Sequence, residues 1–516
     1  MSQKLERNAA GRMVPVVVNG RDSVPYQGVD GYRPSGRKAG PAIASCLDHP
    51  EDGDKRAPSL EAALEQVGLA DGMVVSTHHH LRNGDLVANM IFDVAASLGR
   101  RDLMWFPTAS FPVHANQIRH LDSGVIHHIE GSMNGPLGDY CTQGRMRGLG
   151  VLRSHGGRWQ AIQDGEVHID VAVIAAPTAD AFGNANGLAG PAACGPLGFA
   201  LADSIYAERV IVVTDALVPF PCLPWQIQGN NVDVVVEVDS IGDPTKIVSG
   251  TTQLTQSPDR RRIAELAARF CAEAGIMRNG FSFQAGAGGT TLAFALYLRD
   301  LMRSAGVTAR FARGGSTEHM VEMLEEGLVE YILDGQTFDL DGVVSMRDNP
   351  RHLNTSPFTS YNYHGKGNFA SLVDVAVLGA TEVDLEFNGN VVTHSDGRLL
   401  HGIGGWQNCL SAGCAMLLVP SFRDRIPVIV DRVTTLCGPG ELIDVVVTER
   451  GIAVNPRRAD LLDAVADSDL PIRPITDLKA ELDRICGVPA RPALSDQPVA
   501  VVKWVDGTIL DTVWGV

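Results

Sequence analysis

The stretch Asp374-Val-Ala-Val-Leu-Gly-Ala-Thr-Glu-Val-Asp-Leu-Glu-Phe-Asn-Gly-Asn390 has a related copy earlier in the chain. That copy is Asp170-Val-Ala-Val-Ile-Ala-Ala-Pro-Thr-Ala-Asp-Ala-Phe-Gly-Asn-Ala-Asn186. Both stretches open with Asp-Val-Ala-Val, carry a second Asp at the same distance and close with Asn-x-Asn. Since the spacing is identical, we predict an internal duplication in which the chain is built from two related halves.

One pair of equivalent positions in these stretches differs in its chemistry. Thr178 in the first copy corresponds to Glu382 in the second. In open α/β sheets, ligands bind beyond the carboxyl ends of the strands, and a partly desolvated carboxylate there is a better nucleophile or base. We therefore predict Glu382 as the catalytic residue, with an ordinary surface glutamate in a loop as the alternative.

Continuous apolar runs rich in β-branched residues alternate with helical patterns along the chain. Such runs indicate strands buried on both faces, which is typical of largely parallel sheets. Glycines and small polar residues mark the helix ends, as with the predicted caps Ser59, Ser257 and Thr290 and the predicted stops Gly68, Gly275 and Gly306. The fold class is therefore predicted as α/β, with two tandem domains. The main strands are expected at 72–77, 171–175, 210–214, 281–285, 373–378 and 428–430.

The length of 516 residues exceeds that of a single core. Residues 1–70 are predicted to be an arm that lies over the body, and residues 71–257 to be the first domain. Residues 258–490 are predicted to be the second domain, which carries Glu382. Residues 491–516 are predicted to form a tail that turns as a hairpin at Asp506-Gly507 and packs on the body.

Charge and cysteine content limit the possible partners and location. The net charge of −17 argues against nucleic acid as a partner. The nine cysteines are scattered without a Cys-x-x-Cys pair, a pattern typical of reduced thiols in the cytoplasm. The N-terminal residues lack the apolar core of a signal peptide, and no apolar run of membrane-spanning length occurs. We therefore expect a cytoplasmic chain that does not associate with membranes.

Two glycine-rich loops are candidate sites for an anion or an oxyanion. His401-Gly-Ile-Gly-Gly-Trp-Gln-Asn408 contains Gly402, Gly404 and Gly405, where the backbone can approach a ligand closely. Gly286-Ala-Gly-Gly289 stands between a predicted strand and a predicted helix start, where anions bind. A plain tight turn is the alternative for each loop, and the second does not complete a dinucleotide fingerprint.

Histidine, asparagine and cysteine provide weaker candidates. In an extended segment His78 and His80 would share a face and His79 would point away, and we expect polar substrate contacts or a structural role rather than a metal. The repeated Asn184, Asn186, Asn388 and Asn390 are candidate substrate-binding residues. Cys194 could act as a nucleophile, but no base has a suitable local pattern, so a packing role is expected.

Several of these segments resemble a known family. Thr381–Asn390 with the following His401–Gly405 resembles the glutamate strand and glycine loop of acetate-type coenzyme A transferases, and Asp444–Ala453 resembles their C-terminal strand. The whole chain more closely resembles the alpha-subunit family of citrate lyases. That closer likeness includes His168–Asp180, Thr214–Pro219, Ile241–Thr252 and the tryptophan-containing tail.

The resemblance implies a tandem pair of coenzyme-A-transferase-like domains with an active site between them. It implies a transferase that exchanges the acetyl group of an acetyl-carrier thioester for citrate, with a beta subunit that cleaves the citryl thioester and a gamma subunit that is the acyl carrier protein. The co-substrate would be the carrier's coenzyme-A-like group or acetyl-CoA, with no cofactor bound covalently. Glu382 would attack or position citrate, and an oligomer is expected. Gly402, Gly404, Gly405 and Gln407 would hold the oxyanion or thioester, and Gly286, Gly288 and Gly289 the carrier group.

The sequence departs from the simpler transferases at two places. Trp406 separates Gly405 from Gln407, and Arg450 stands where an aromatic residue is usual. Transfer in the citrate lyase type is described as passing through a ternary complex and an acyl anhydride rather than an enzyme-bound thioester. Citramalate in place of citrate, a sugar-phosphate isomerase and a scaffold that only docks a carrier remain alternative functions.

Overall fold

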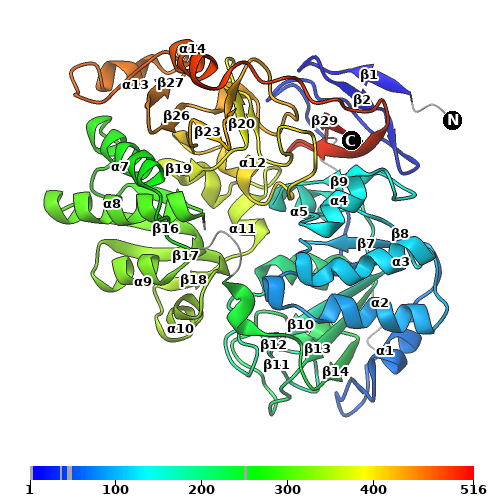
Figure 1. Ribbon diagram of the computed structural model, residues 1–516. Coiled ribbons are helices and arrows are strands. Elements are labelled where there is room, and N and C mark those ends of the chain that lie inside the picture. The colour runs from blue at the N-terminus through cyan, green and yellow to red at the C-terminus, as the bar shows by residue number, and fades with distance from the viewer. Residues whose placement is uncertain (1–3, 35–37, 43–48, 249–252, 287) are drawn as a thin grey trace.

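Two large parallel sheets organise the molecule, as Figure 1 shows. The computed structural model describes residues 4–34, 38–42, 49–248, 253–286 and 288–516, so Cys46, residues 249–252 of one matched stretch and residue 287 of the first glycine loop lie outside the described residues. The first sheet has seven parallel strands in the order β5 (Arg56–Ala57), β14 (Val234–Glu237), β13 (Arg209–Thr214), β10 (Val171–Ala176), β6 (Val74–Thr77), β7 (Leu103–Pro107) and β8 (Ile126–Ile129).

The second sheet has eight strands, of which only the last pair is antiparallel. Their order is β18 (His352–Asn354), β17 (Val329–Thr337), β16 (Ala309–Ser316), β15 (Ser282–Ala285), β19 (Val375–Leu378), β22 (Ala415–Leu418), β26 (Val445–Thr448) and β27 (Gly451–Val454). The strands β10 and β19, which hold the Val-Ala-Val of each repeat, are buried, as the apolar runs predicted. The α/β fold class is confirmed.

The two sheets share one topology, which confirms the internal duplication. Read across the sheet, the strand order β8-β7-β6-β10-β13-β14 of the first sheet matches the order β17-β16-β15-β19-β22-β26 of the second. After β10 the chain forms β11 (Thr178–Ala179) and β12 (Ala185–Asn186), and after β19 it forms β20 (Glu382–Asp384) and β21 (Gly389–Asn390). Thr178 pairs with Asn186 as Glu382 pairs with Asn390. Glu382 therefore lies in a short strand and not in a loop.

Most helix ends follow the predicted caps. The Ser59 side chain accepts from Ala62 N–H at the start of α1 (Leu60–Gln66), and Ser257 accepts from Arg260 N–H at the start of α7 (Pro258–Glu273). The predicted cap Thr290 is wrong, because the cap of α8 (Gly289–Ala305) is Gly288, two residues earlier, in an extended conformation. At Gly289 a Cβ would stand 2.4 Å from the Gln253 carbonyl oxygen, so the chain makes this entry with glycine.

The remaining helices pack around the two sheets and between the two halves (Figure 1). Over the first sheet and its loops lie α2 (Val87–Ser97), α3 (Gln117–Ser123), α4 (Pro136–Thr142), α5 (His155–Gln163) and α6 (Leu201–Tyr206). In its described residues, the second half contains six further helices: α9 (Glu318–Glu325), α10 (Leu340–Asp348), α11 (Pro357–Tyr361), α12 (Trp406–Cys409), α13 (Ala459–Ala464) and α14 (Ile475–Cys486).

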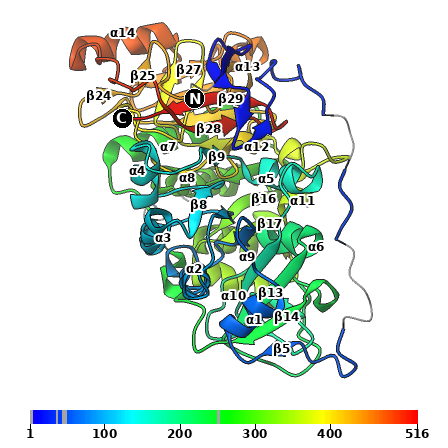
Figure 2. The ribbon, with the colours of Figure 1, turned by 90° about the vertical axis from the view of Figure 1, so that its right-hand side faces the viewer.

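The arm and the tail meet on the body, which Figure 2 shows from the side. The tail forms the hairpin β28 (Pro498–Lys503) and β29 (Ile509–Trp514), as predicted, and β28 also pairs in parallel with β9 (Gly150–Leu152). The arm contributes β1 (Leu5–Arg7), β2 (Met13–Pro15), β3 (Val17–Val18) and β4 (Arg21–Asp22). Between β1 and β2, the Asn8 amide donates to the carbonyls of Ile509 and Leu510. The exact division into residues 1–70, 71–257, 258–490 and 491–516 stays a prediction.

Candidate functional site

The repeated Asp-x-x-x-Asn pattern builds a turn rather than a binding surface. Asp180 accepts from the N–H groups of Phe182, Gly183 and Asn184, and the Asn184 amide donates to it at 2.9 Å. Asp384 and Asn388 are related in the same way, with an amide-to-carboxylate distance of 3.2 Å. Because Asn184 and Asn388 hold their own loops, their predicted contact with substrate stays a prediction without geometric support.

Glu382 is buried, with 2% of its surface exposed, and hydrogen bonds hold both of its oxygens. Oε2 accepts from the Asn390 amide at 2.9 Å and from Thr434 N–H at 2.7 Å, and Oε1 accepts from the Thr434 hydroxyl at 3.0 Å. The carboxylate faces a small cavity of about 60 Å³ that Arg432 and residues 488–492 also line. Asn390 thus contacts the proposed catalytic group.

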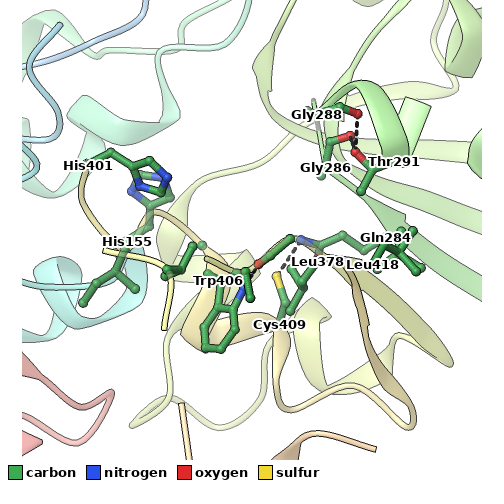
Figure 3. Close-up of a pocket in the computed structure, with 18 of the residues that line it drawn as sticks. His155, Gln284, Gly286, Gly288, Thr291, Leu378, His401, Trp406, Cys409 and Leu418 are labelled. Carbon is green, nitrogen blue, oxygen red and sulfur yellow. Dashed lines mark hydrogen bonds between the residues drawn. The ribbon is translucent and has the colours of Figure 1, made fainter. Parts of the chain in front are cut away.

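A much larger cavity, of about 510 Å³, lies where the two halves meet (Figure 3). His155 and Phe199 come from the first half, and the second half provides the rest of its wall. The halves are joined beside it, because His155 N–H donates to the Gly404 carbonyl at 2.9 Å and Gly156 N–H donates to Asn408 at 3.1 Å. Thr381, next to Glu382, lines this cavity, but Glu382 does not.

The charged side chains in the described wall of the large cavity are all basic: Arg260, Arg313 and Arg423. Arg313 is 2% exposed, donates to Gln284 at 2.8 Å and lies over the Tyr361 ring. Arg423 donates to the carbonyls of Thr381 and Ala380, and burial followed by the neighbouring Arg260 lowers its pKa. No carboxylate is found in that wall, although the chain is strongly acidic, so the cavity favours an anionic ligand.

Two partly buried histidines, His155 and His401, line the same cavity. Burial, and then the charge of Arg158, lowers the pKa of His155 to about 3. Burial also lowers the pKa of His401, whose Nδ1 lies 2.7 Å from the Gly402 carbonyl. Figure 3 shows the two rings on the same side of the cavity. Burial thus favours the neutral form of both rings, and the arginines are the permanently charged side chains of the described wall.

The glycine loops contribute to the cavity in part. Gly286, Gly288 and Gly289 line it at the N-terminus of α8, where the Thr291 hydroxyl donates to the carbonyls of Gly286 and Gly288 (Figure 3). Free N–H groups at a helix N-terminus favour anions. Gly405 also lines the cavity, and no described residue accepts from its N–H.

The other predicted oxyanion-binding groups are engaged elsewhere. Gly402 N–H donates to the Ser132 hydroxyl at 3.0 Å, and Gly404 is paired with Ser154 across the junction of the halves. The Gln407 amide donates to the Cys437 carbonyl at 2.9 Å, outside the wall of the large cavity. The prediction of consecutive free N–H groups at residues 402–405 is therefore wrong at Gly402, because the loop also joins the two halves.

The remaining predicted polar residues lie in the first half and do not line the large cavity, although the His80 ring centroid is 6.5 Å from that of Phe199 in its wall. His78 and His80 stack with ring centroids 5.8 Å apart, so they share a face as predicted. His78 Nε2 lies 3.2 Å from buried Asp203, and burial lowers the pKa of His80 to about 3. Asn186 donates to the Leu223 carbonyl.

Cys194 is buried and has a raised pKa, which suits a packing residue. Within the described ranges, no group of three or more His, Cys, Asp or Glu side chains could hold a metal ion. No helix among those residues is both long and apolar enough to cross a membrane.

The sequence patterns did not single out the three cavity arginines, because they stand on separate elements. Arg260 belongs to α7, Arg313 to β16 and Arg423 to the short strand β23 (Phe422–Arg423). The sequence did hold one signal for Arg313. It lies in the strand β16, whose other residues are small or apolar, except for the exposed Arg310. A buried arginine in such a strand needs an acceptor or a ligand.

Comparison with known proteins identifies close relatives of the chain. The family model described as citrate lyase, alpha subunit, matches residues 53–516. The citrate lyase alpha chain of Haemophilus influenzae is 39% identical over 90% of this chain and 93% of that protein. The Klebsiella pneumoniae protein of the same name is 40% identical over 88% of this chain and 90% of that protein.

Solved structures give the same result. The putative alpha subunit of citrate lyase from Streptococcus mutans, solved in complex with citrate, superposes with a TM-score of 0.94 and 39% identity, covering 99% of each chain. The malonate decarboxylase alpha subunit of Acinetobacter baumannii shares the fold at 18% identity, with a TM-score of 0.62 over 84% of this chain and 88% of that one.

Proposed function

The chain belongs to the alpha-subunit family of citrate lyases and is an acyl transferase, and we propose that it exchanges the acyl group of a thioester in the large arginine-lined cavity. The observation that carries this assignment is the charge of the described wall. Arg260, Arg313 and Arg423 converge there with the N-terminus of α8 and without an acidic side chain. A tricarboxylate and the phosphates of a coenzyme-A-like group are both anions that such a wall attracts.

The proposed exchange is balanced in two steps. A carboxylate oxygen of citrate attacks the acetyl thioester carbonyl, the carbon–sulfur bond breaks, and a mixed anhydride and a thiolate form. The thiolate then attacks the citryl carbonyl of the anhydride, which yields the citryl thioester and acetate. The Gly405 N–H, which lines the cavity, would stabilise the oxyanion, and the arginines would hold the remaining carboxylates.

Glu382 would position the attacking citrate carboxylate or make the first attack itself. In the second case an acetyl-glutamyl anhydride and the thiolate form first, and a citrate carboxylate then attacks the acetyl carbonyl and releases Glu382, which gives the same mixed anhydride. Two observations support a role for Glu382 in the reaction. Thr381, the residue before Glu382, lines the large cavity. Arg423 donates to the Thr381 carbonyl, and the negative charge of Glu382 acts to raise the pKa of Arg423. For direct attack, an oxygen would have to leave the hydrogen bonds of Thr434 or Asn390. A positioning role needs no such movement.

The co-substrate would be acetyl-CoA or the coenzyme-A-like group of an acyl carrier subunit, held near Gly286, Gly288 and Gly289. The chain would work in one complex with that carrier and with a lyase subunit that cleaves the citryl thioester. The eight cysteines that the structure describes are free thiols, which supports a place in the cytoplasm.

The decisive experiment mixes the purified chain with acetyl-CoA and citrate and follows citryl-CoA and acetate by mass spectrometry. The wild type should form both products. Glu382→Gln should lower the rate at least about 100-fold, since it removes the charge of a positioned carboxylate. Glu386→Gln, an exposed neighbour on the same loop, is the matched control and should retain the wild-type rate.

Equal rates for the wild type and Glu382→Gln would keep the reaction and remove Glu382 from it. If neither protein forms citryl-CoA, the assay is repeated with acetylated carrier protein in place of acetyl-CoA, and then with citramalate in place of citrate. Failure with all of these would contradict transfer in this cavity.

A further inference from the structure

One hydroxyl in the wall of the large cavity is free to donate its hydrogen. Tyr361 is the last residue of α11, which packs against α5 where the two halves meet (Figure 1). Its side chain lines the cavity. Among the described residues nothing accepts a hydrogen bond from its hydroxyl, although Tyr361 is partly buried. A polar group withdrawn from water needs a partner, and a ligand in the cavity can provide one.

The Tyr361 hydroxyl lies directly against Gly405. A Cβ on Gly405 would stand 2.8 Å from the hydroxyl oxygen and 3.1 Å from Cζ of the ring. The Gly405 φ angle is −86°, which other residues also adopt, so glycine is needed at this position for space and not for conformation. The glycine thus leaves room for the end of the tyrosine side chain.

Two donors therefore share one place in the cavity wall. Gly405 also lines the cavity, and no described residue accepts from its N–H. Since covalent bonds of about 1.5 Å join Cβ to Cα and Cα to the nitrogen, the Gly405 nitrogen lies no more than roughly 6 Å from the Tyr361 hydroxyl oxygen. An oxyanion accepts from donors about 3 Å away, so one oxygen atom between these two groups can reach both.

Burial keeps the Tyr361 hydroxyl protonated. Burial raises the pKa of Tyr361, while the charge and the hydrogen bond of Arg313 act in the opposite direction. Arg313 lies over the ring, 4.6 Å from its centroid, and is itself held by Gln284. A hydroxyl that accepts from a cation donates more strongly, because the hydrogen bonds polarise one another. Tyr361 is therefore a neutral donor whose strength Arg313 increases.

Both halves fix the position of Tyr361. In the first half, a Cβ on Gly156 would stand 2.3 Å from the Tyr361 carbonyl oxygen, and the His155 ring centroid lies 6.3 Å from that of the tyrosine. In the second half, Arg313 and Gly405 pack against the phenol. Because these neighbours leave little room, the hydroxyl is in place before the reaction begins, as stabilisation of a developing charge requires.

We propose that Tyr361 is a catalytic residue that donates, together with Gly405 N–H, to the oxygen of the thioester carbonyl. The proposal deepens the proposed function and rests on it for the reaction. When the carboxylate attacks the acetyl carbonyl, the π electrons of the C=O bond move onto its oxygen, and both hydrogen bonds strengthen. When the carbon–sulfur bond breaks, these electrons re-form the C=O bond and the thiolate leaves with the bonding pair. Tyr361 keeps its proton throughout.

The first test is the kinetics of Tyr361→Phe, which removes the hydroxyl and keeps the ring beside Arg313. The kcat for citryl-CoA formation should fall about 100-fold, as expected for the loss of one oxyanion donor, and the KM for citrate should stay within about twofold. Tyr363→Phe is the matched control, because it makes the same change two residues further on, at an exposed tyrosine. It should retain the wild-type kcat.

The second test needs binding but no turnover. In a ketone analogue of acetyl-CoA, a methylene group replaces the sulfur, so the carbonyl keeps its place and cannot be cleaved. Infrared difference spectroscopy of the bound, isotope-labelled analogue should show a lower carbonyl stretching frequency in the wild type than in Tyr361→Phe, because the hydroxyl polarises the carbonyl. Tyr363→Phe should match the wild type.

Three results would overturn the proposal. The first is an unchanged kcat in Tyr361→Phe, with or without a higher KM. The second is a lower kcat with the same carbonyl frequency as the wild type, which would make the effect a structural one. The third is a wild type that does not bind the analogue. If the wild type binds the analogue but forms no citryl-CoA, the proposed function is contradicted, and the infrared comparison still decides whether Tyr361 contacts the carbonyl.

Discussion

At the scale of single residues, the positive charge in the cavity wall is the main determinant of what binds. Arg313 is held by Gln284, which in turn donates to the Cys409 sulfur at 2.5 Å. These hydrogen bonds fix the guanidinium plane of Arg313 against the Tyr361 ring. Only a planar, forked cation can hold two acceptors in one plane. Arg313 is thus positioned to orient a carboxylate.

Arg313→Lys should raise the KM for citrate about 10- to 100-fold, since a charge-assisted hydrogen bond and its geometry are lost. Steady-state kinetics with varied citrate would measure this effect. Arg398→Lys, an exposed arginine paired with Asp396, should leave the KM unchanged. A normal KM in Arg313→Lys would exclude Arg313 from citrate binding.

Residue-level prediction from the sequence succeeds only where the information is local. The broken symmetry of Thr178 and Glu382 is visible in the sequence, and the structure gives the two positions the same pairing with Asn186 and Asn390. The arginine cluster is not visible, because its members come from three elements that only the tertiary fold brings together.

At the scale of elements, a glycine packs closely against a backbone carbonyl of the turn that follows the central strand in each half. In the second half, a Cβ on Gly440 would lie 1.8 Å from the Glu386 carbonyl oxygen, although the Gly440 φ angle is an ordinary one. The restriction is therefore one of space. The turn also anchors the loop that follows Glu382, because Gly440 N–H donates to Asn388.

Gly440→Ala should lower the free energy of unfolding by roughly 1–3 kcal/mol, since the backbone of the turn must move to admit a methyl group. Differential scanning fluorimetry would show this as a lower Tm. Gly379→Ala is the control, because a Cβ there meets nothing within 4 Å. Equal melting temperatures would show that the turn yields without cost.

Elements with a strong periodic pattern could be predicted, and most short elements could not; β25 (Ile429–Val430), which lies within the strand predicted at 428–430, is an exception. Buried strands and capped helices such as α7 appear where the sequence places them, because burial and capping are decided within a few residues. The short strand β20 depends on pairing with β21 and β25 (Ile429–Val430), the latter far along the chain, so local sequence could not predict it.

At the scale of the whole molecule, one buried ionic network ties the arm, the first half and the tail together. Arg153 contacts Glu130 at 2.9 Å and Glu166 at 2.8 Å, Arg21 of the arm contacts Glu130, and Lys503 of the tail contacts Glu166. Burial alone would raise the pKa of Glu166, but Arg153 and Lys503 outweigh it and lower the pKa to about 2. The contacts of Glu166 with Arg153 and Lys503 therefore stabilise the fold only while Glu166 is ionised.

A carboxyl group with a depressed pKa in the folded state contributes stability above its unfolded pKa, and this is lost as the pH falls. Glu166→Gln should thus lower the free energy of unfolding by about 1–2 kcal/mol at pH 7, allowing for partial solvent exposure. The difference from the wild type should shrink from about pH 4.5 toward pH 2. Thermal unfolding of the wild type and Glu166→Gln between pH 7 and pH 2 tests this prediction, with the exposed Glu208→Gln as control. A difference in stability between Glu166→Gln and the wild type that persists at pH 2 would contradict it.

The pairing of β28 with β9 has a consequence for synthesis of the chain. The strand β9 (Gly150–Leu152) is translated long before its partner β28 (Pro498–Lys503). During most of translation the nascent chain therefore carries an unpaired strand edge, which is an aggregation hazard that chaperones commonly shield. A chain truncated before β28 would leave β9 without this partner.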